Sequence, residues 1–274
     1  MERMNQTIIN SDHKSTLNYL RLVWKYLSTI HSLGKQQIKN KYANTILGVI
    51  LSFIKLSLAL LIYYVVFGII IKIQIQGAHY IIFVLLGYLT WSLFITIVTD
   101  TSNSLLSAKN LYTKIYMPKI CLPLSRLYIG IFEYFISIVA LIVLLIYFKS
   151  PPDLKILLLP VLLFLTVFVG LSIGLWISIF SIKKRDWIHL IPYLISFGIF
   201  ITPVFYPTTI IPADYTFLIY VNPLAYIIDL YRWIFTNQAL PSFLYLYGFV
   251  PVIIIFCWSF YLYRKKDKII VDYI

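Results

Sequence analysis

Charged residues inside long apolar runs are the side chains of this sequence that are best placed for chemistry. Lys55 and Glu133 each lie within such a run. A charge in a hydrocarbon layer costs free energy, so it usually faces the interior of a bundle or a water-filled path. Lys55 lies near one end of its run and is expected to extend its amine to the lipid headgroups. Glu133 lies deeper, and its position fits either a contact between helices or a place on a transport pathway.

Aromatic residues form a second candidate set. Tyr63, Tyr64 and Phe67 lie in one apolar run, and Phe197 and Phe200 lie in a later one. An aromatic ring has an apolar face over which a sugar ring can slide, and tyrosine adds a polar tip. Aromatic residues make up 18% of the chain, so belts at the membrane surface account for many of them. These five residues and Glu133 are therefore candidates for a substrate path, with a lipid interface as the alternative for the rings.

The sequence lacks the motifs of ATP hydrolysis and of metal binding. It contains no GxxxxGK[ST], the loop that holds nucleotide phosphates. Its 10 acidic residues and 4 histidines show no spacing typical of a metal site. We therefore expect no catalytic residue, no metal ion and no cofactor on this chain, and any ATP-driven work requires a partner subunit.

The composition indicates an all-α integral membrane protein. Hydrophobic residues make up 61% of the 274 residues and charged residues only 12%, far from the composition of soluble domains. The chain has 23 basic and 10 acidic residues, and the basic ones flank apolar runs, which indicates membrane topology and not nucleic-acid binding. Runs long enough to cross a hydrocarbon core, which needs about 20 residues, lie at 46–71, 80–98, 124–148, 156–181, 187–206 and 243–263.

The distribution of the basic residues predicts which side faces the cytoplasm. Those of the N-terminal region 1–45, of the loop between the second and third runs, of 183–185 and of the tail 264–274 fall on one side of six spans. The opposite side has only Lys72, Lys149, Lys155 and Arg232. Because basic residues concentrate in cytoplasmic loops, we expect one membrane domain, with six spans at 46–263 and both termini in the cytoplasm.

Residues 19–32 predict an amphipathic helix before the first span. Leu20, Trp24 and Leu27 recur at helical spacing, and Arg21 and Lys25 lie on the other face. Tryptophan and basic side chains favour the headgroup region, so we expect this helix to lie in the cytoplasmic membrane interface. Packing on a partner protein is the alternative.

The segment 207–241 is too apolar for an ordinary loop, and it is divided. Two short pieces, 215–221 and 224–235, are separated by Asn222 and Pro223. Neither piece can cross a bilayer, and a seventh span would place the basic tail on the wrong side. The segment therefore predicts a re-entrant or interfacial helical hairpin on the external face, with its broken backbone shielded by protein.

A glycine motif within the fourth run predicts close helix packing. Gly170 and Gly174 form a GxxxG pattern in an apolar segment. Small residues at this spacing let two helix backbones approach each other. The partner helix belongs either to the same chain or to a second subunit.

The loop between the second and third spans has the composition of a stiff connector. Residues 103–116 are long enough for a few helical turns, and Pro118 and Pro123 join them tightly to the third span. Lys109, Lys114 and Lys119 place the loop in the cytoplasm. A subunit outside the membrane could grip such a loop, and a solvated connector whose lysines only set topology is the alternative.

Taken in order along the chain, several short motifs resemble the permease subunits of type-2 ABC exporters that move lipid-linked polysaccharides. The resemblance extends from Tyr42 to Arg264. It rests on Leu47-Gly48, Asn110-Leu111, Lys114, Met117-Pro118-Lys119, Leu122-Pro123, Arg185-Asp186, Thr202-Pro203-Val204-Phe205-Tyr206-Pro207, Asn222-Pro223-Leu224 and Arg232. The sequence departs from the family at Leu51 and Leu56, where the family often has tryptophan and proline.

The resemblance implies a homodimer in a bacterial cytoplasmic membrane, with two copies of a nucleotide-binding ATPase subunit that carry ATP and Mg²⁺. That ATPase would contact the N-terminal helix and the central loop. The loop residues concerned are Asn110, Leu111, Tyr112, Lys114, Tyr116, Met117, Pro118 and Lys119. The external hairpin region would include Pro203, Tyr206, Pro207, Asn222, Pro223 and Arg232.

The same resemblance implies a cargo. It would be an undecaprenyl-diphosphate-linked glycan of the O-antigen, capsule or teichoic-acid type, which crosses the membrane through a channel between protomers. A permease for a drug or a small lipid is the alternative within the family. An ATP-independent lipid flippase or a membrane glycosyltransferase is the alternative outside it.

Overall fold

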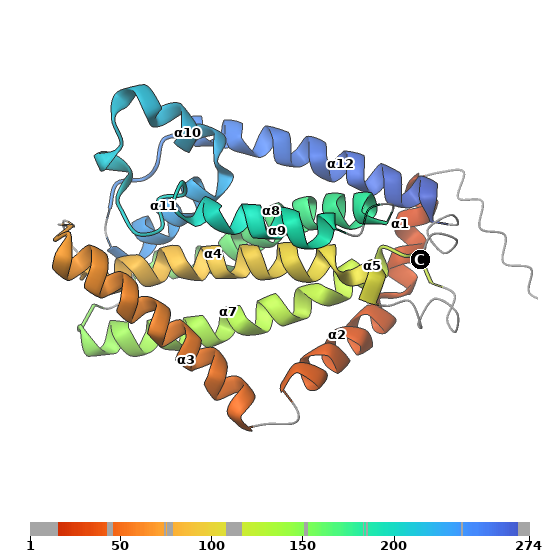
Figure 1. Ribbon diagram of the computed structural model, residues 1–274, viewed down its shortest axis with the longest axis horizontal. Coiled ribbons are helices and arrows are strands. Elements are labelled where there is room, and N and C mark those ends of the chain that lie inside the picture. Colours follow the sequence, from red (N-terminus) through yellow and green to blue (C-terminus); the bar gives the residue numbers. More distant parts are fainter. Residues whose placement is uncertain are drawn as a thin grey trace, which may run out of the picture.

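The computed structural model describes residues 16–42, 46–73, 75, 79–107, 117–150, 153–182, 184, 186–236 and 238–267. In these ranges the chain forms helices joined by turns, without a β-strand (Figure 1). Five helices are long and apolar enough to cross a membrane, by length and composition: Gly48–Ile70, Tyr80–Ser102, Cys121–Tyr147, Leu154–Ser181 and Phe243–Lys265. The predicted class, an all-helical protein of the membrane type, is thereby confirmed.

The bundle is elongated and its two ends differ. Its elements are α1 (Thr16–Lys25), α2 (Leu27–Tyr42), α3 (Ile46–Tyr63), η1 (Tyr64–Ile70), α4 (Tyr80–Ser102), α5 (Ser104–Ser107), α7 (Cys121–Tyr147), η2 (Leu154–Leu158), α8 (Leu159–Ser181), α9 (Trp187–Ser196), η3 (Phe197–Ile199), η4 (Thr208–Ile210), η5 (Ala213–Tyr215), α10 (Thr216–Val221), α11 (Pro223–Thr236), η6 (Phe243–Gly248) and α12 (Phe249–Lys266). At one end, here called the basic end, α1 and α5 lie near the C-terminal end of α12, and α2 runs from α1 towards α3 (Figure 1). The opposite end carries α10 and is called the hairpin end.

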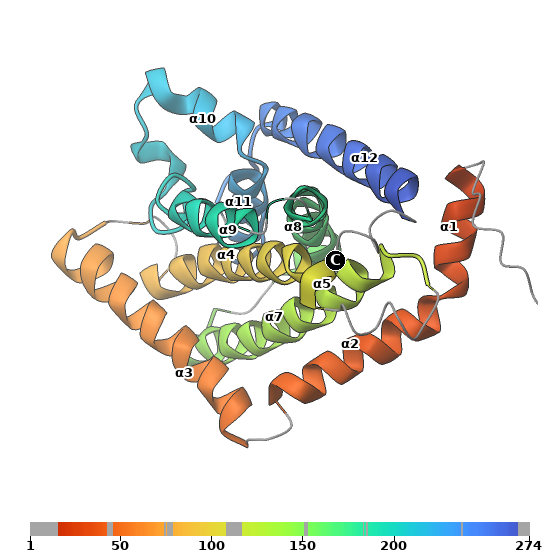
Figure 2. The ribbon, with the colours of Figure 1, turned by 45° about the vertical axis from the view of Figure 1, so that its right-hand side comes forward.

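Helix α4 forms the core of the bundle because it is apolar on every side. Of its apolar window 72% is buried, and it packs between α7 and α8 (Figure 2). The GxxxG motif of α8 faces α4: a Cβ atom on Gly174 would overlap Thr101 Oγ1, and one on Gly170 would lie 3.0 Å from Ile97. The close packing predicted from this motif therefore occurs within the chain.

Helix α3 is the least buried of the five long helices, with 11% of its apolar window buried. It leans away from the bundle in both views (Figures 1 and 2). It contacts α4 and α7, and the side chains of Leu56 and Leu60 are buried. It continues as a π-helix, η1, which widens the last turns where aromatic side chains pack.

The N-terminal helix differs from the prediction of one helix over 19–32. The structure has two helices, α1 and α2, which meet at Tyr26 and run at an angle to each other (Figure 2). The second continues to Tyr42 because its polar side chains bond to α7: His31 Nδ1 lies 2.9 Å from Tyr128 Oη, and Gln37 Nε2 donates to Ser125 Oγ at 2.9 Å. The periodicity of the apolar residues predicted a helix in this region, and the contacts with α7 account for the continuation of α2 to Tyr42.

The fifth span was predicted to reach residue 206, and this boundary is wrong. The apolar helix extends over Trp187–Ile199 and is shorter than the five helices that are long enough to cross a membrane. It stops there because the ring of Pro203 disfavours a helical conformation at Thr202, and because Pro203 has no N–H to donate. The chain turns instead, and the backbone at Val204 approaches α4 so closely that a Cβ atom on Gly87 would lie 2.5 Å from its carbonyl oxygen.

The two short pieces predicted in 207–241 are both helices. They are α10, with 6 residues, and α11, with 14 residues, and Asn222 separates them as expected. The side chain of Asn222 accepts a hydrogen bond from the Leu224 N–H at 3.0 Å, which caps α11 in the usual way. Its amide also donates to Thr202 Oγ1 at 2.9 Å and thereby joins α11 to the turn after α9.

Candidate functional site

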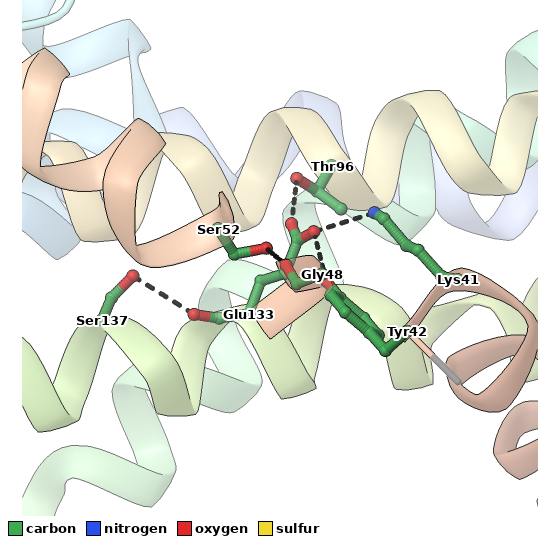
Figure 3. A network of polar contacts seen from close by, with 7 residues as sticks. All are labelled: Lys41, Tyr42, Gly48, Ser52, Thr96, Glu133 and Ser137. Atoms are coloured by element: carbon green, nitrogen blue, oxygen red, sulfur yellow. Dashed lines mark hydrogen bonds and ion pairs between the residues drawn. The ribbon is translucent and has the colours of Figure 1, made fainter. Parts of the chain in front are cut away.

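A polar network around Glu133 lies between three helices (Figure 3). Its Oε1 accepts hydrogen bonds from Lys41 Nζ and Tyr42 Oη, each at 2.8 Å, and its Oε2 accepts one from Thr96 Oγ1 at 3.2 Å. The carboxylate of α7 therefore connects the end of α2 to α4. The side chains of Lys41 and Glu133 are 43% and 28% exposed, so the ion pair is partly solvated. Of the two roles open from the sequence, the structure shows the contact between helices.

A cavity of about 460 Å³ adjoins this network. Its walls come from α2, α3, α4 and α7, and they combine charged, hydroxyl and aromatic side chains. The lining includes Lys41, Tyr42, Lys55, Tyr88, Trp91 and Glu133. Lys55, which was expected to extend to the headgroups, borders this cavity. A space with cations and aromatic rings suits a ligand that has anionic and sugar-like parts.

A second cavity, of about 530 Å³, lies towards the basic end. Its lining is strongly polar and includes Gln37, Asp100 and Arg126. Within the described part of the chain, Asp100 Oδ2 and Gln37 Oε1 are buried without a hydrogen-bond partner. Lys41 lines both cavities, and its partner Glu133 lines the first.

The aromatic candidates divide into two groups. Tyr63 and Phe67 stack on the buried ring of Phe205, with ring centroids 3.9 and 5.3 Å from its centroid. These two rings therefore pack the first span against the turn after α9. The other three are at the surface: Tyr64 is 39% exposed, Phe197 51% and Phe200 60%. The structure does not gather the aromatic candidates around Glu133.

Arg232 fixes the hairpin end. Its side chain is fully buried, its guanidinium lies 3.5 Å from the centroid of the Phe83 ring, and its Nη2 donates to the Val204 carbonyl at 2.9 Å. Its Nη1 pairs with Asp229 Oδ1 at 3.2 Å. The next carbonyl, that of Phe205, accepts from Tyr80 Oη at 2.8 Å. Helices α4 and α11 thus hold the backbone of the turn from both sides.

The other residues predicted for the external hairpin lie at the same end. Pro203 is buried, whereas Tyr206, Pro207 and Pro223 are half-buried. The hydroxyl of Tyr206 donates to the carbonyls of Phe200 and Ile201, each at 3.0 Å. Tyr206 therefore links the turn to the backbone that precedes it. With Asn222 and Arg232, the structure brings the predicted set together around one turn.

At the basic end, Asp267 joins three segments that are distant in sequence. Its Oδ1 accepts from the Lys119 N–H at 2.8 Å and from Tyr19 Oη at 3.3 Å. A carboxylate at the end of α12 thereby contacts α1 and the residues that lead into α7. Burial lowers the pKa of Lys119 and the charge of Asp267 opposes this effect, while burial raises the pKa of Tyr19.

The residues predicted to contact an ATPase are only partly within the described structure. Asn110, Leu111, Tyr112, Lys114 and Tyr116 lie outside the described residues. Met117 and Lys119 are 1% and 5% exposed, and Pro118 is buried as well. This end of the loop is therefore anchored in the bundle. On the N-terminal helices, the predicted interfacial residues are all exposed: Leu20, Arg21, Trp24, Lys25 and Leu27.

Several residues of these contacts were missed by sequence reasoning. Thr96 and Asp267 gave no signal, because each contacts a residue far away in the chain. Lys41 could have been found, because an acid in an apolar run needs a cation and Lys41 lies close to the start of the first span.

Comparison with known proteins places this arrangement in a family. The model of the family "ABC-2 type transporter" matches residues 28–236, which include the Glu133 network and Arg232. The chain belongs to the ABC-2 type transporter family. The family predicted from the sequence motifs is thereby confirmed.

Two relatives of this ABC-2 type transporter extend over most of its length. It is 24% identical over 245 residues to the O-antigen export system permease protein RfbA of Myxococcus xanthus, with 89% of this chain and 94% of the relative covered. It is 25% identical over 227 residues to the protein of the same description from Klebsiella pneumoniae, with 81% and 87% covered. The similarity therefore includes both the basic end and the hairpin end of the bundle.

Proposed function

We propose that this ABC-2 type transporter is the permease subunit of an ATP-driven exporter, and that it moves an undecaprenyl-diphosphate-linked polysaccharide across the bacterial cytoplasmic membrane. The observation that carries the proposal is the similarity to O-antigen export permeases over 81–89% of the chain. The cargo is a glycan of the O-antigen, capsule or teichoic-acid type. The chain acts as a homodimer, and two nucleotide-binding subunits supply ATP and Mg²⁺, since its own sequence has no P-loop.

The proposed topology has six spans with both termini in the cytoplasm. The five long helices supply five of them, and α9 with η3 supplies a short fifth span that the turn at Val204 completes. The basic end then faces the cytoplasm. Helix α1 lies in that membrane interface with Trp24 among the headgroups, and α10 with α11 forms the external hairpin.

The proposed path for the glycan begins at the cavity beside Glu133. Lys41 and Lys55 offer positive charge for a diphosphate, and Tyr88 and Trp91 offer rings for the first sugars. The exposed rings of Tyr64, Phe197 and Phe200 then face the second protomer and line the route between the two copies. Tyr63 and Phe67 do not line this route. They stack on Phe205 and hold the first span against the turn after α9.

The test is reconstitution with the ATPase subunit. The chain and its candidate ATPase are co-expressed, inverted membrane vesicles are prepared, and the lipid-linked glycan that enters the lumen is measured after addition of ATP. We expect ATP-dependent entry of the glycan and none with a non-hydrolysable nucleotide. Entry of a drug or of an ordinary phospholipid, without the glycan, would contradict the proposed cargo while leaving the family unchanged.

A further inference from the structure

An apolar cavity of about 500 Å³ lies at the hairpin end, away from the proposed glycan path. It is bounded by the last turns of α7, by η2 and the start of α8, and by Phe235 of α11. Leu141 and Leu145 form its buried floor, whereas Ile146 at its rim is 72% exposed. The cavity thus opens sideways from the bundle, at the level where the proposed topology places the outer half of the bilayer.

The residue that closes one end of this cavity has an unusual backbone. Lys149 follows the C-cap of α7 with φ of 52°, in the left-handed region. The Ser150 N–H bonds to the Leu145 carbonyl and the Lys149 N–H to the Ile146 carbonyl, which is the Schellman pattern that usually has glycine at this position. A residue with a Cβ atom there costs about 1 kcal/mol.

The charges around the cavity leave that side chain available. Asp153, the acid next along the chain, is bound by Lys155 Nζ at 3.1 Å and by the Leu154 N–H at 2.7 Å. The amine of Lys155 also lies 5.0 Å from the centroid of the Trp233 ring. Among the described residues, the amine of Lys149 has neither an ion-pair nor a hydrogen-bond partner. The cavity therefore combines an apolar interior with an unpaired cation at its mouth.

We propose that this cavity binds a resident anionic glycerophospholipid, with one acyl chain between α7 and α8 and the phosphate on Lys149. The apolar interior suits an acyl chain, and the positive charge at its mouth suits an anionic headgroup. The lysine stem extends along the apolar wall and its amine reaches the headgroups. Because Phe235 of α11 forms part of the cavity wall, the bound lipid also contacts α11 and stabilises its position.

The structure provides a matched control for this proposal. Lys72, after η1, has φ of 57° and is also a lysine in the left-handed region at the end of a span. It does not line the cavity. Replacing either lysine by glycine removes the backbone strain and one positive charge, so both variants fold at least as well as the parent. Only Lys149→Gly removes the proposed phosphate contact.

The experiment measures lipid retained by the purified chain. The parent, Lys149→Gly, Lys149→Gln and Lys72→Gly are mixed in detergent with phosphatidylglycerol and phosphatidylcholine, and bound lipid is counted by native mass spectrometry. We expect the parent and Lys72→Gly to prefer phosphatidylglycerol. Both Lys149 variants should bind it about five-fold more weakly, the value of one cation at a headgroup.

Three outcomes overturn the proposal. One is equal retention of phosphatidylglycerol by Lys149→Gly and Lys72→Gly. Another is a parent that retains neither phospholipid, and the third is a parent that retains only a polyprenyl phosphate. The proposal goes beyond the glycan-export function, and lipid retention is measured without ATP or glycan, so its failure leaves that function untouched.

Discussion

The guanidinium of Arg232 lies 3.5 Å from the centroid of the Phe83 ring and is fully buried. Arg232 belongs to α11 and Phe83 to α4, so the contact joins the hairpin end to the central helix. A buried guanidinium is stable only when it is paired, and here Asp229 and the Val204 carbonyl supply the partners. With the Tyr80 hydroxyl, which donates to the Phe205 carbonyl, Arg232 therefore holds the turn that places Phe205 against the first span.

Replacing Arg232 by methionine should destabilise the protein strongly. The substitution leaves Asp229 buried without its cation, and breaking a buried pair in this way costs about 3–5 kcal/mol. Thermal unfolding of the purified chain in detergent measures the effect. Arg232→Met combined with Asp229→Leu should recover most of the loss, because no unpaired charge remains. Equal destabilisation of the single and the double variant would show that the pair itself is not what matters.

The Lys41–Glu133 pair should contribute little to stability and more to transport. Both side chains are partly exposed, so a double-mutant cycle with Lys41→Gln and Glu133→Gln should give a coupling of roughly 0.5–1 kcal/mol in unfolding free energy. Glycan export should fall several-fold in either variant, since both side chains line the cavity at which the proposed glycan path begins. Lys39→Gln, an exposed lysine on the same helix, is the control and should export normally. Additive unfolding energies together with normal export would contradict both statements.

The sequence predicted the long helices well because their signal is local. An apolar run of about 20 residues is a property of neighbouring residues, and it located α4 from its first residue and α7 and α8 within a few residues; the run 243–263 corresponds to η6 together with α12. The end of α9 was missed because it depends on how the chain folds after Pro203. There the backbone of Val204 packs on Gly87, which belongs to another helix.

Most partners of the charged residues could not be read from the sequence. Glu133 was recognised as a charge in an apolar run, yet its cation lies 92 residues away on α2. Arg232 was counted among the basic residues of the external side and, from the resemblance, in the external hairpin, and the structure buries it fully. Its acid, Asp229, lies three residues earlier on the same helix, whereas its contacts with Phe83 and Val204 form only when segments distant in sequence pack together.

The proposed topology predicts which residues are accessible from outside the cell. In a variant with the exposed Cys257 replaced by serine, single cysteines at Lys25 and Lys184 should be shielded from an impermeant thiol reagent, because they lie on cytoplasmic segments. Cysteines at Asp153 and Asp214 should react. Labelling of intact cells, with permeabilised cells as the control for reactivity, measures this. Reaction of both Lys184 and Asp214 cysteines in intact cells would contradict a fifth span formed by α9.

The last prediction concerns how ATP hydrolysis reaches the spans. An effector can shift a conformation only if it interacts differently with the two states. A partner subunit that binds the central loop can therefore move the spans only if the loop is rigidly attached to the bundle. Met117 and Lys119 provide this attachment, because they are buried and the Lys119 N–H is bound by Asp267. That carboxylate also receives the hydroxyl of Tyr19, so α1, α12 and the start of α7 are expected to move together.

Asp267→Ala should therefore lower the amount of glycan exported per ATP hydrolysed, while the complex still assembles. Asp214→Ala, an exposed acid at the hairpin end, is the matched control and should leave this ratio unchanged. Both quantities are measured in the same vesicles, as released phosphate and as glycan in the lumen. A proportional fall in hydrolysis and export would mean that Asp267 supports assembly or stability. An unchanged ratio at full assembly would show that the loop transmits its movement without this junction.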